Sequence, residues 1–283
     1  MGNIFSSSNN NKTKTPKVIL VTGASSGLGK VSALHLLERG HVVYGAARRV
    51  EQMQDLVDKG GHAIKLDITD EKACAAAVKR IIDEQGKIDV LVNNAGFALY
   101  GAVELVPVSD AERQFQVNLF GLAALTQKVI PHMRDAGTGT IINVSSMGGR
   151  IYTPFGAWYH ATKYALEGWS DCLRLELAPF GIKVAIVEPG GFSTELGHNV
   201  IDKALEQATG GPYQGRLEKL HAANEATASA LGDPIVIARV IQQASEAKNP
   251  KHRYLKGPFA KELVFIKEWL GTAVYDWVLN MQF

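Results

Sequence analysis

The chain has 283 residues, of which 46% are hydrophobic and 20% are charged, and its formal net charge is +2. These values are ordinary for a folded soluble protein and give no reason to expect a nucleic-acid partner. The two cysteines, Cys74 and Cys172, are too far apart in sequence for a disulfide framework or a metal site, so we expect buried free thiols, cytoplasmic residence and no metal.

The first residues are polar and offer little to bury, so we predict that residues 1–16 form a disordered tail. The segment from Met1 to Ser6 fits the N-myristoylation pattern. An acylated Gly2 with peripheral membrane association is therefore the alternative to an unmodified tail. No stretch approaches the roughly 18 uninterrupted apolar residues that a membrane-spanning helix needs.

The remaining chain, residues 17–283, alternates short β-branched runs with helical patterns, which predicts a single domain of the α/β class. This alternation is typical of a Rossmann-type fold, a doubly wound parallel β-sheet with helices on both faces. The rhythm changes in a variable segment, about 192–232, that is irregular and helical. A helix over 233–246 and a last strand at 253–256 follow it. The earlier strand-like runs are 17–22, 41–46, 63–66, 90–92, 140–144 and 183–187.

A glycine-rich turn follows the first strand, at the carboxyl edge where open parallel sheets bind their ligands. Gly23, Gly27 and Gly29 would let the backbone turn tightly and approach a pyrophosphate at the start of the next helix. Their spacing differs from the commonest dinucleotide fingerprint, and a purely structural turn is the alternative. Within this turn we also assign Ser25, Ser26 and Leu28 to a cofactor site.

Arg48 and Arg49 follow the second strand, where a site that prefers NAD would place a carboxylate on the ribose 2′-hydroxyl. A guanidinium group suits a 2′-phosphate, so NADP(H) is favoured over NAD(H), although paired arginines can also mark a solvated helix start. Asp67, with Ile68 beside it, follows the third strand. Asp67 would bind the adenine amino group or cap the helix that begins near Asp70.

Polar and glycine signatures continue at the next strand ends. Asn94, Ala95 and Gly96 follow the fourth strand, Ser146 follows the fifth, and Pro189 and Gly190 follow the sixth. Because these strand ends share one edge of the sheet, we expect the residues to surround one ligand site.

Tyr159 and Lys163 lie four residues apart in a helical stretch, which places a phenol and an ammonium on one helix face. A cation beside a phenol stabilises the phenolate and would lower the pKa of Tyr159 toward neutrality. The pair is suited to proton transfer.

Together these motifs resemble the short-chain dehydrogenase/reductase superfamily over roughly Lys17 to Thr194. The stretch from Tyr159 to Leu177 is similar to the hydroxysteroid and retinol dehydrogenase-like branch of carbonyl reductases. The resemblance implies a homodimer or homotetramer, built by packing the helices around Asn118 and Tyr159.

The resemblance also implies roles. Tyr159 would donate a proton to a carbonyl oxygen as hydride arrives, and Ser146 would hydrogen-bond that oxygen. Lys163 would lower the phenol pKa and hold the nicotinamide ribose, and Asn118 would hold a water that connects Lys163 to solvent. The implied cofactor residues are Gly23, Ser25, Ser26, Gly27, Leu28, Gly29, Arg48, Arg49, Asp67, Ile68, Asn94, Ala95, Gly96, Tyr159, Lys163, Pro189, Gly190, Phe192 and Thr194.

Apolar residues flank the reaction site, so we expect a lipophilic carbonyl substrate and an NADP(H)-dependent carbonyl reductase. The alternatives are a steroid, retinol or alcohol dehydrogenase that works oxidatively, and a regulator that senses NADP without turnover. The expected substrate pocket consists of Leu99, Ser146, Met147, Phe155, Tyr159 and Phe192.

The chain ends in an apolar helix at about 260–280, which carries Trp269 and Trp277 and few charges. It would pack on its own domain or on a sister subunit. Resting in a membrane surface is the alternative.

Overall fold

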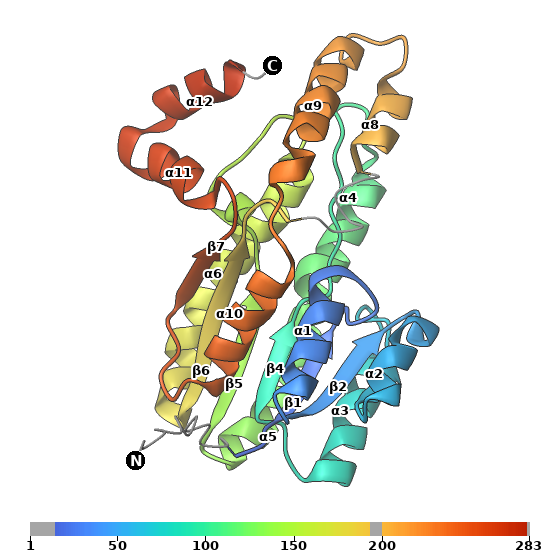
Figure 1. Ribbon diagram of the computed structural model, residues 1–283, viewed down its shortest axis with the longest axis vertical. Helices are drawn as coiled ribbons and strands as arrows, with labels where there is room; N and C mark the ends of the chain where they lie inside the picture. The colour runs from blue at the N-terminus through green and yellow to red at the C-terminus, as the bar shows by residue number, and fades with distance from the viewer. Residues whose placement is uncertain (1–14, 193–199, 282–283) are drawn as a thin grey trace, which may run out of the picture.

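The computed structural model describes residues 15–192 and 200–281, and the structural statements below concern these residues. A single sheet of seven parallel strands has the order β3-β2-β1-β4-β5-β6-β7 (Figure 1). The strand order reverses at β1, between β2 and β4, where doubly wound sheets bind their ligands. The predicted Rossmann-type fold is confirmed. The strands are β1 (Val18–Thr22), β2 (Val42–Ala47), β3 (His62–Lys65), β4 (Val90–Asn93), β5 (Gly139–Val144), β6 (Ile182–Pro189) and β7 (Arg253–Lys256).

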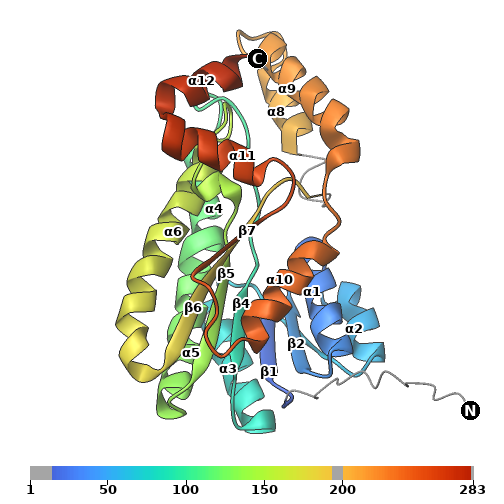
Figure 2. The same ribbon diagram turned by 60° about the vertical axis from the view of Figure 1, so that its left-hand side comes forward.

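The central strands are buried on both faces because helices cover both sides of the sheet. In β1, Val18 and Leu20 join one hydrophobic cluster, whereas Ile19 and Val21 join the other. The alternation follows the two-residue period of a strand. Figures 1 and 2 show the two helical layers. One layer holds α3 (Glu71–Gln85), α5 (Leu122–Asp135) and α6 (Ala157–Leu177), and the other holds α1 (Gly27–Glu38), α2 (Gln54–Asp58) and α10 (Ile235–Glu246).

A short helix, α4 (Val108–Phe115), continues through a π-helical turn, η2 (Gln116–Gly121), directly into α5. The described part of the variable segment is largely helical, as predicted, and contains α8 (Val200–Ala208) and α9 (Gln214–Thr227). These two helices have a small hydrophobic cluster of their own, to which Phe155 is joined.

The C-terminal segment differs from the single helix expected at 260–280. It consists of α11 (Ala260–Phe265), which continues as a π-helical turn to Leu270, and α12 (Thr272–Asn280). The break lies at Gly271, whose φ of 86° and ψ of 170° do not belong to a helix. We call this segment the C-terminal hairpin (residues 260–280).

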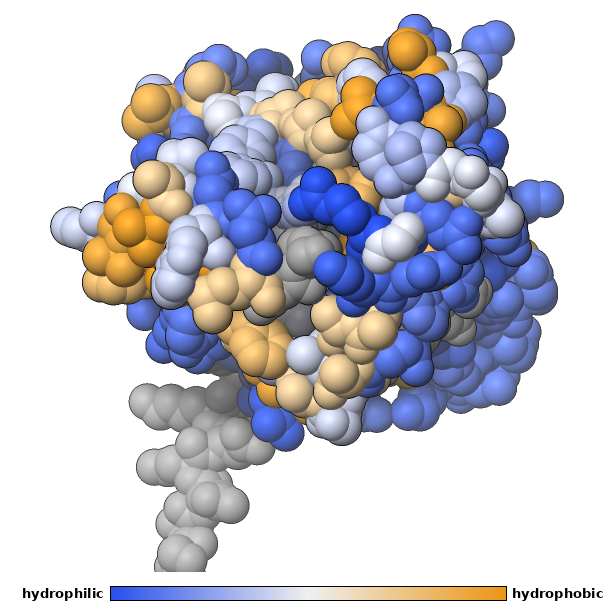
Figure 3. Space-filling view, turned by 90° about the horizontal axis from the view of Figure 1, so that it is seen from above, coloured by the Kyte–Doolittle hydropathy of each residue, from blue (hydrophilic) through white to orange (hydrophobic). Residues whose placement is uncertain are grey.

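The C-terminal hairpin packs on its own domain through a buried face and leaves its other face exposed. Tyr275 and Val264 cluster with Ile151, as expected for packing on the same chain. Figure 3 views this end of the molecule from above and shows apolar side chains on the side where the hairpin lies in Figure 1. The hairpin's exposed large apolar side chains, together with that of the residue that follows it, are Phe265, Trp269, Leu270, Val274, Trp277 and Met281.

Both cysteines are free thiols, but only one is buried. Burial raises the pKa of Cys74 to about 11, so this thiol is inert. Cys172 is exposed on α6, contrary to the expectation, because it lies on the helix side that faces away from the sheet. None of the helices in the described part of the chain combines the length and apolar composition needed to cross a bilayer.

Candidate active site

The glycine turn has the backbone shape that the sequence predicted. Gly23 and Gly27 have φ angles of 69° and 54°, which residues with a side chain rarely adopt. A Cβ atom on Gly29 would collide with the Asn94 side chain and with the Gly23 carbonyl. The first turn of α1 carries no acidic side chain. A bare turn at a helix N-terminus without acidic side chains fits the pyrophosphate of a dinucleotide.

Thr22, which the sequence analysis did not single out, joins this turn to the end of β4. Its Oγ1 accepts hydrogen bonds from the backbone N–H groups of Asn94 and Ala95, both at 3.0 Å. The Asn94 side chain in turn donates to the Thr22 carbonyl at 3.0 Å. Asn94 therefore braces the glycine turn. Only the pairing of β1 with β4 reveals this role, because 72 residues separate the two partners.

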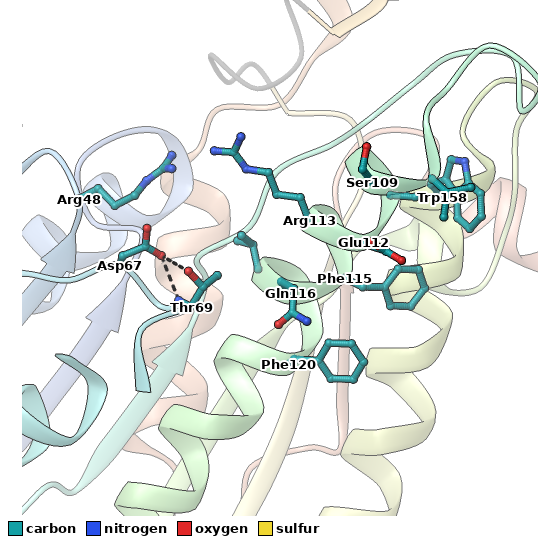
Figure 4. A pocket seen from close by; sticks show the side chains of 13 residues that line it. Arg48, Asp67, Thr69, Ser109, Glu112, Arg113, Phe115, Gln116, Phe120 and Trp158 are labelled. Carbon is teal, nitrogen blue, oxygen red and sulfur yellow. Dashed lines mark hydrogen bonds between the residues drawn. The ribbon is translucent and has the colours of Figure 1, made fainter. Parts of the chain in front are cut away.

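A cavity of about 850 Å³ opens beside the ends of β2 and β3 (Figure 4). Arg48 reaches into it from the end of β2, and Arg113 reaches into it from α4. Two guanidinium groups that face one cavity can bind an anion such as a 2′-phosphate. Arg113 was missed because it lies within a helix, away from every strand end. Arg49 instead turns toward the glycine turn, where its Nη2 lies 3.3 Å from Ser26 Oγ.

Asp67 lines the same cavity and binds Thr69. Its carboxylate accepts hydrogen bonds from the Thr69 backbone N–H at 3.0 Å and from the Thr69 hydroxyl at 2.8 Å. Thr69, and then Arg48 and Arg113, lower the pKa of Asp67. Asp67 does not cap the helix near residue 70, because Asp70 itself accepts from the first-turn amides of α3. The Ile68 side chain is buried in the core.

Tyr159, Ser146 and Lys163 lie together where β5 meets α6. The Ser146 hydroxyl faces the Tyr159 phenol closely enough to lower its pKa. Lys163 lies 5.9 Å from the centre of the Tyr159 ring and donates to the Val144 carbonyl at 3.0 Å. The strand-end serine and the helix pair therefore form one cluster, as the sequence predicted.

Burial shifts the two titratable groups of this cluster in opposite directions. It lowers the pKa of Lys163 to about 8 and raises the pKa of Tyr159, whereas the hydrogen bond from Ser146 lowers the pKa of Tyr159. The expectation that Lys163 makes the phenol more acidic is thus not met, because loss of water around the phenol outweighs its favourable contacts. The phenol keeps its proton at neutral pH and can donate it.

Asn118 lies in the π-helical turn η2 and is 1% exposed. Its side chain accepts from the Phe97 N–H at 2.9 Å and donates to the Phe97 carbonyl at 2.8 Å. It also donates to Thr162 on α6 at 3.2 Å. Asn118 therefore connects the segment after β4 to α6. Gly96 leaves room for it, since a Cβ atom there would lie 3.1 Å from Asn118 Oδ1.

The end of β6 supports the site through its backbone. Gly190 donates to the Lys256 carbonyl at 2.7 Å, and a Cβ atom on it would lie 2.6 Å from the Pro258 carbonyl oxygen. Phe192 differs from the expectation of a residue that lines the substrate pocket. It is 8% exposed and packs in the core beside Gly232 and Gly257, which lack side chains. Thr194 lies outside the described residues.

The other expected pocket residues, Leu99, Met147 and Phe155, are each partly buried. Leu99 is half-buried, and Met147 packs against the cluster that includes the C-terminal hairpin. Phe155 packs near Tyr213, with ring centres 6.3 Å apart, and has a φ of 64° that is strained for an aromatic residue. Tyr100, which the sequence analysis did not select, lies with its ring centre 6.0 Å from that of Tyr159.

Comparison with known proteins agrees with this geometry. The family model of short chain dehydrogenases matches residues 17–204, more than half of the chain. The chain belongs to the short-chain dehydrogenase family. A similar short-chain dehydrogenase is a 3-ketodihydrosphingosine reductase of Bacteroides thetaiotaomicron, 36% identical over 94% of this chain and 97% of the relative.

Two further members of the family are similar over most of their length. An NADPH-dependent 3-dehydrocapnine reductase of Ornithobacterium rhinotracheale is 33% identical over 87% of this chain and 89% of its own. The crystal structure of a short-chain dehydrogenase from Streptomyces avermitilis is 36% identical, covers 88% of this chain and 90% of its own, and superposes with a TM-score of 0.76. This chain is therefore an oxidoreductase of that family.

Proposed function

We propose that this short-chain dehydrogenase is an NADP(H)-dependent reductase that converts a hydrophobic ketone or aldehyde to its alcohol, reversibly. The observation that carries the proposal is the cluster of Ser146, Tyr159 and Lys163 at the carboxyl edge of the sheet, where the Lys163 ammonium lies 5.9 Å from the centre of the Tyr159 ring. Two similar proteins are named as reductases of 3-ketodihydrosphingosine and 3-dehydrocapnine, which supports reduction of a ketone.

A bound nicotinamide cofactor would supply the hydride. Tyr159 donates its proton to the carbonyl oxygen, and its raised pKa keeps that proton in place until the reaction. Ser146 hydrogen-bonds the same oxygen as negative charge develops on it. Lys163 would hold the ribose hydroxyls of the cofactor, and its ammonium lies 5.9 Å from the centre of the Tyr159 ring.

The preference for NADP(H) rests on the cavity that Arg48 and Arg113 line. A 2′-phosphate placed there would meet two guanidinium groups, which bind phosphate through several hydrogen bonds. The similar 3-dehydrocapnine reductase is named as NADPH-dependent, which agrees with this assignment.

The oxidative alternative, a steroid, retinol or alcohol dehydrogenase, needs a phenolate to accept a proton. The raised pKa of Tyr159 favours the protonated phenol, which is the form that donates a proton in carbonyl reduction. The other alternative, a regulator that senses NADP, has no need for a serine, a phenol and an ammonium arranged around one reaction point.

Activity with a substrate panel tests the proposal. NADPH absorbance is followed with 3-ketodihydrosphingosine, 3-dehydrocapnine and a set of aromatic and steroid ketones. We expect turnover with at least one of them, and a loss in kcat of about 10²- to 10⁴-fold in Tyr159→Phe, the scale of general acid catalysis.

The control for Tyr159→Phe is its affinity for NADPH, measured by cofactor fluorescence, which should match that of the wild type because the ring is retained. Turnover that survives in Tyr159→Phe would remove the phenol from the mechanism. NADPH binding without turnover on the whole panel would favour the regulator.

A further inference from the structure

His160 follows Tyr159 directly on α6 and is 6% exposed. Its ring contacts both ends of the loop 148–153. Its Nδ1 lies 2.9 Å from the carbonyl oxygen of Gly148. Its Nε2 lies 3.0 Å from the backbone nitrogen of Thr153 and 3.0 Å from the Thr153 hydroxyl. One imidazole thus closes the loop 148–153 onto the catalytic helix.

The hydrogen bonds fix the protonation state of the ring. The Thr153 N–H can only donate, so Nε2 must accept, and the single ring proton must lie on Nδ1, which donates to Gly148. Burial lowers the pKa of His160, and the Gly148 carbonyl raises it. The titratable groups that face the ring are Tyr100 and Tyr159, with ring centres 6.4 and 5.8 Å away. Phenols stay uncharged at acidic pH, so neither tyrosine would stabilise a positively charged imidazole ring.

Gly148 and Gly156 leave the space that the imidazole ring of His160 occupies. A Cβ atom on Gly156 would lie 2.7 Å from His160 Cδ2 and 2.8 Å from Nε2. A Cβ atom on Gly148 would lie 3.0 Å from His160 Nδ1. Two glycines therefore stand where any larger residue would push the ring out of its place.

The contacts of Gly148 connect the ring to the reaction site. While its carbonyl accepts from His160, its N–H donates to Ser146 Oγ at 3.0 Å. This bond occupies a lone pair of the Ser146 oxygen and leaves its hydroxyl proton available to Tyr159 or to a substrate oxygen. The four residues form a closed path from Tyr159 through Ser146 and Gly148 to His160, its neighbour in sequence.

We propose that His160, as the neutral Nδ1–H tautomer, is a positioning residue that holds Ser146 in place beside Tyr159 through Gly148. This inference rests on the proposed function only where activity is the readout. It predicts that the position of the 146–153 segment, and with it kcat, depends on one uncharged ring.

The first test is a set of substitutions at position 160. His160→Phe keeps the ring and removes both hydrogen bonds, whereas His160→Gln keeps one donor and one acceptor. We expect His160→Phe to lower kcat about 10- to 100-fold, the scale of a misplaced catalytic group, with the KM for NADPH nearly unchanged. His160→Gln should recover most of this loss. Equal losses in kcat for the two variants, or a matching rise in the KM for NADPH, would overturn the proposal.

The pH profile gives a readout that a merely structural role would not move. As pH falls through the lowered pKa of His160, the ring gains a proton on Nε2 and can no longer accept from Thr153. We expect an acidic decline of kcat in the wild type that is absent in His160→Gln. His35→Gln, at a partly buried histidine that binds Gln242 on the other side of the sheet, is the matched control and should keep the decline. An unchanged profile in His160→Gln would refute the assignment.

Two measurements do not require activity. In nitrogen-15 NMR spectra of histidine-labelled protein, the resonance absent from His160→Gln should show the Nδ1–H tautomer at neutral pH, and an Nε2–H tautomer would contradict the proposal. Gly156→Ala should destabilise the wild type but cost clearly less in a His160→Ala background, because the collision is then removed. Additive effects on the melting temperature would show that the ring does not fill this space. If the panel shows no turnover while the tautomer and the Gly156→Ala results are as expected, the proposed function fails and the positioning role of His160 stands.

Discussion

In the proposed cofactor site, the fold brings two arginine side chains together from distant positions in the chain. Arg48 follows a strand and Arg113 lies on α4, yet both line one cavity and both lower the pKa of Asp67 (Figure 4). Arg49, although adjacent to Arg48, contacts Ser26 instead. The three arginines are therefore not equivalent, and they can be separated experimentally.

We predict that Arg48→Gln and Arg113→Gln each reduce the preference for NADPH over NADH by about 10- to 100-fold, since a hydrogen bond to a charged group contributes about 1.5 to 3 kcal/mol. Dissociation constants of both cofactors, measured by calorimetry, check this. Arg49→Gln is the matched control and should change the preference less. If Arg113→Gln leaves the ratio as in the wild type, Arg113 has no part in cofactor selection.

At the scale of elements, a buried ionic network joins α6, β6, β7 and the loop after β5. Glu188 on β6 is 0% exposed and pairs with Arg150 and Arg253, both at 3.3 Å. Arg253 also binds Glu167 at 3.1 Å, and Arg150 binds Glu268 of the C-terminal hairpin at 2.6 Å. The network fixes the loop that carries Ile151 between the sheet and the hairpin.

The network gives a pH dependence of stability. Burial, and then Glu167, raise the pKa of Glu188 from 4.5 to about 7. Because the folded-state pKa is raised, the stabilising contribution of its proton is complete below 4.5 and is lost as pH rises through about 7. We expect Glu188→Gln to flatten the fall of the melting temperature between about pH 5 and pH 8.

Glu268→Gln is the control for this experiment, because it makes the same substitution on a partly exposed partner of Arg150. Its melting temperature should follow pH as the wild type does. A Glu188→Gln variant with the wild-type pH dependence would show that Glu188 does not titrate in this range.

The C-terminal hairpin depends on one backbone angle. Gly271 has a φ of 86°, and no atom of the described residues lies within 4 Å of the point that a Cβ atom would occupy, so only its backbone conformation requires glycine. We predict that Gly271→Ala destabilises the protein by about 1 to 3 kcal/mol. Gly215→Ala, in an open position of α9, should instead be neutral or stabilising by up to about 1 kcal/mol. Thermal unfolding distinguishes the two outcomes, and equal effects would refute the backbone argument.

At the scale of the whole molecule, apolar side chains remain exposed on two separate surfaces. One lies on η2 and α6, where Phe120, Tyr164 and Leu175 are 52%, 42% and 66% exposed. The other is the outer face of the C-terminal hairpin, where Trp269 and Trp277 are 76% and 64% exposed. Surfaces of this kind are commonly covered by a partner.

We propose that the surface around Phe120, Tyr164 and Leu175 forms the contact of a homodimer or homotetramer. We expect Leu175→Arg combined with Phe120→Arg to lower the mass measured by light scattering to that of one chain, because two buried charges would face each other. Trp269→Ser with Trp277→Ser is the control and should leave the mass unchanged. The reverse pattern would place the subunit contact on the C-terminal hairpin.

The positions of the strands along the chain and the residues at their ends follow from the sequence because they depend on local patterns. The β-branched runs, the glycine turn and the spacing of Tyr159 and Lys163 are each set by residues within a few positions of one another. The strands, the glycine turn and the helical pair appear in the structure as expected, whereas the expected lowering of the Tyr159 pKa does not. The roles implied for Gly2 and Thr194 concern residues that the structure does not describe.

The tertiary structure decided the properties that depend on contacts between distant segments. Burial, which no local pattern specifies, raised rather than lowered the pKa of Tyr159 and placed Phe192 in the core. Arg113 joined Arg48 because α4 and the end of β2 border the same cavity, and His160 gained its partners only through contacts with the loop that packs on α6. The sequence by itself determined the fold class and the chemical groups of the site, since both are encoded locally. Packing decided their protonation and their neighbours, because desolvation and long-range contacts exist only in the folded chain.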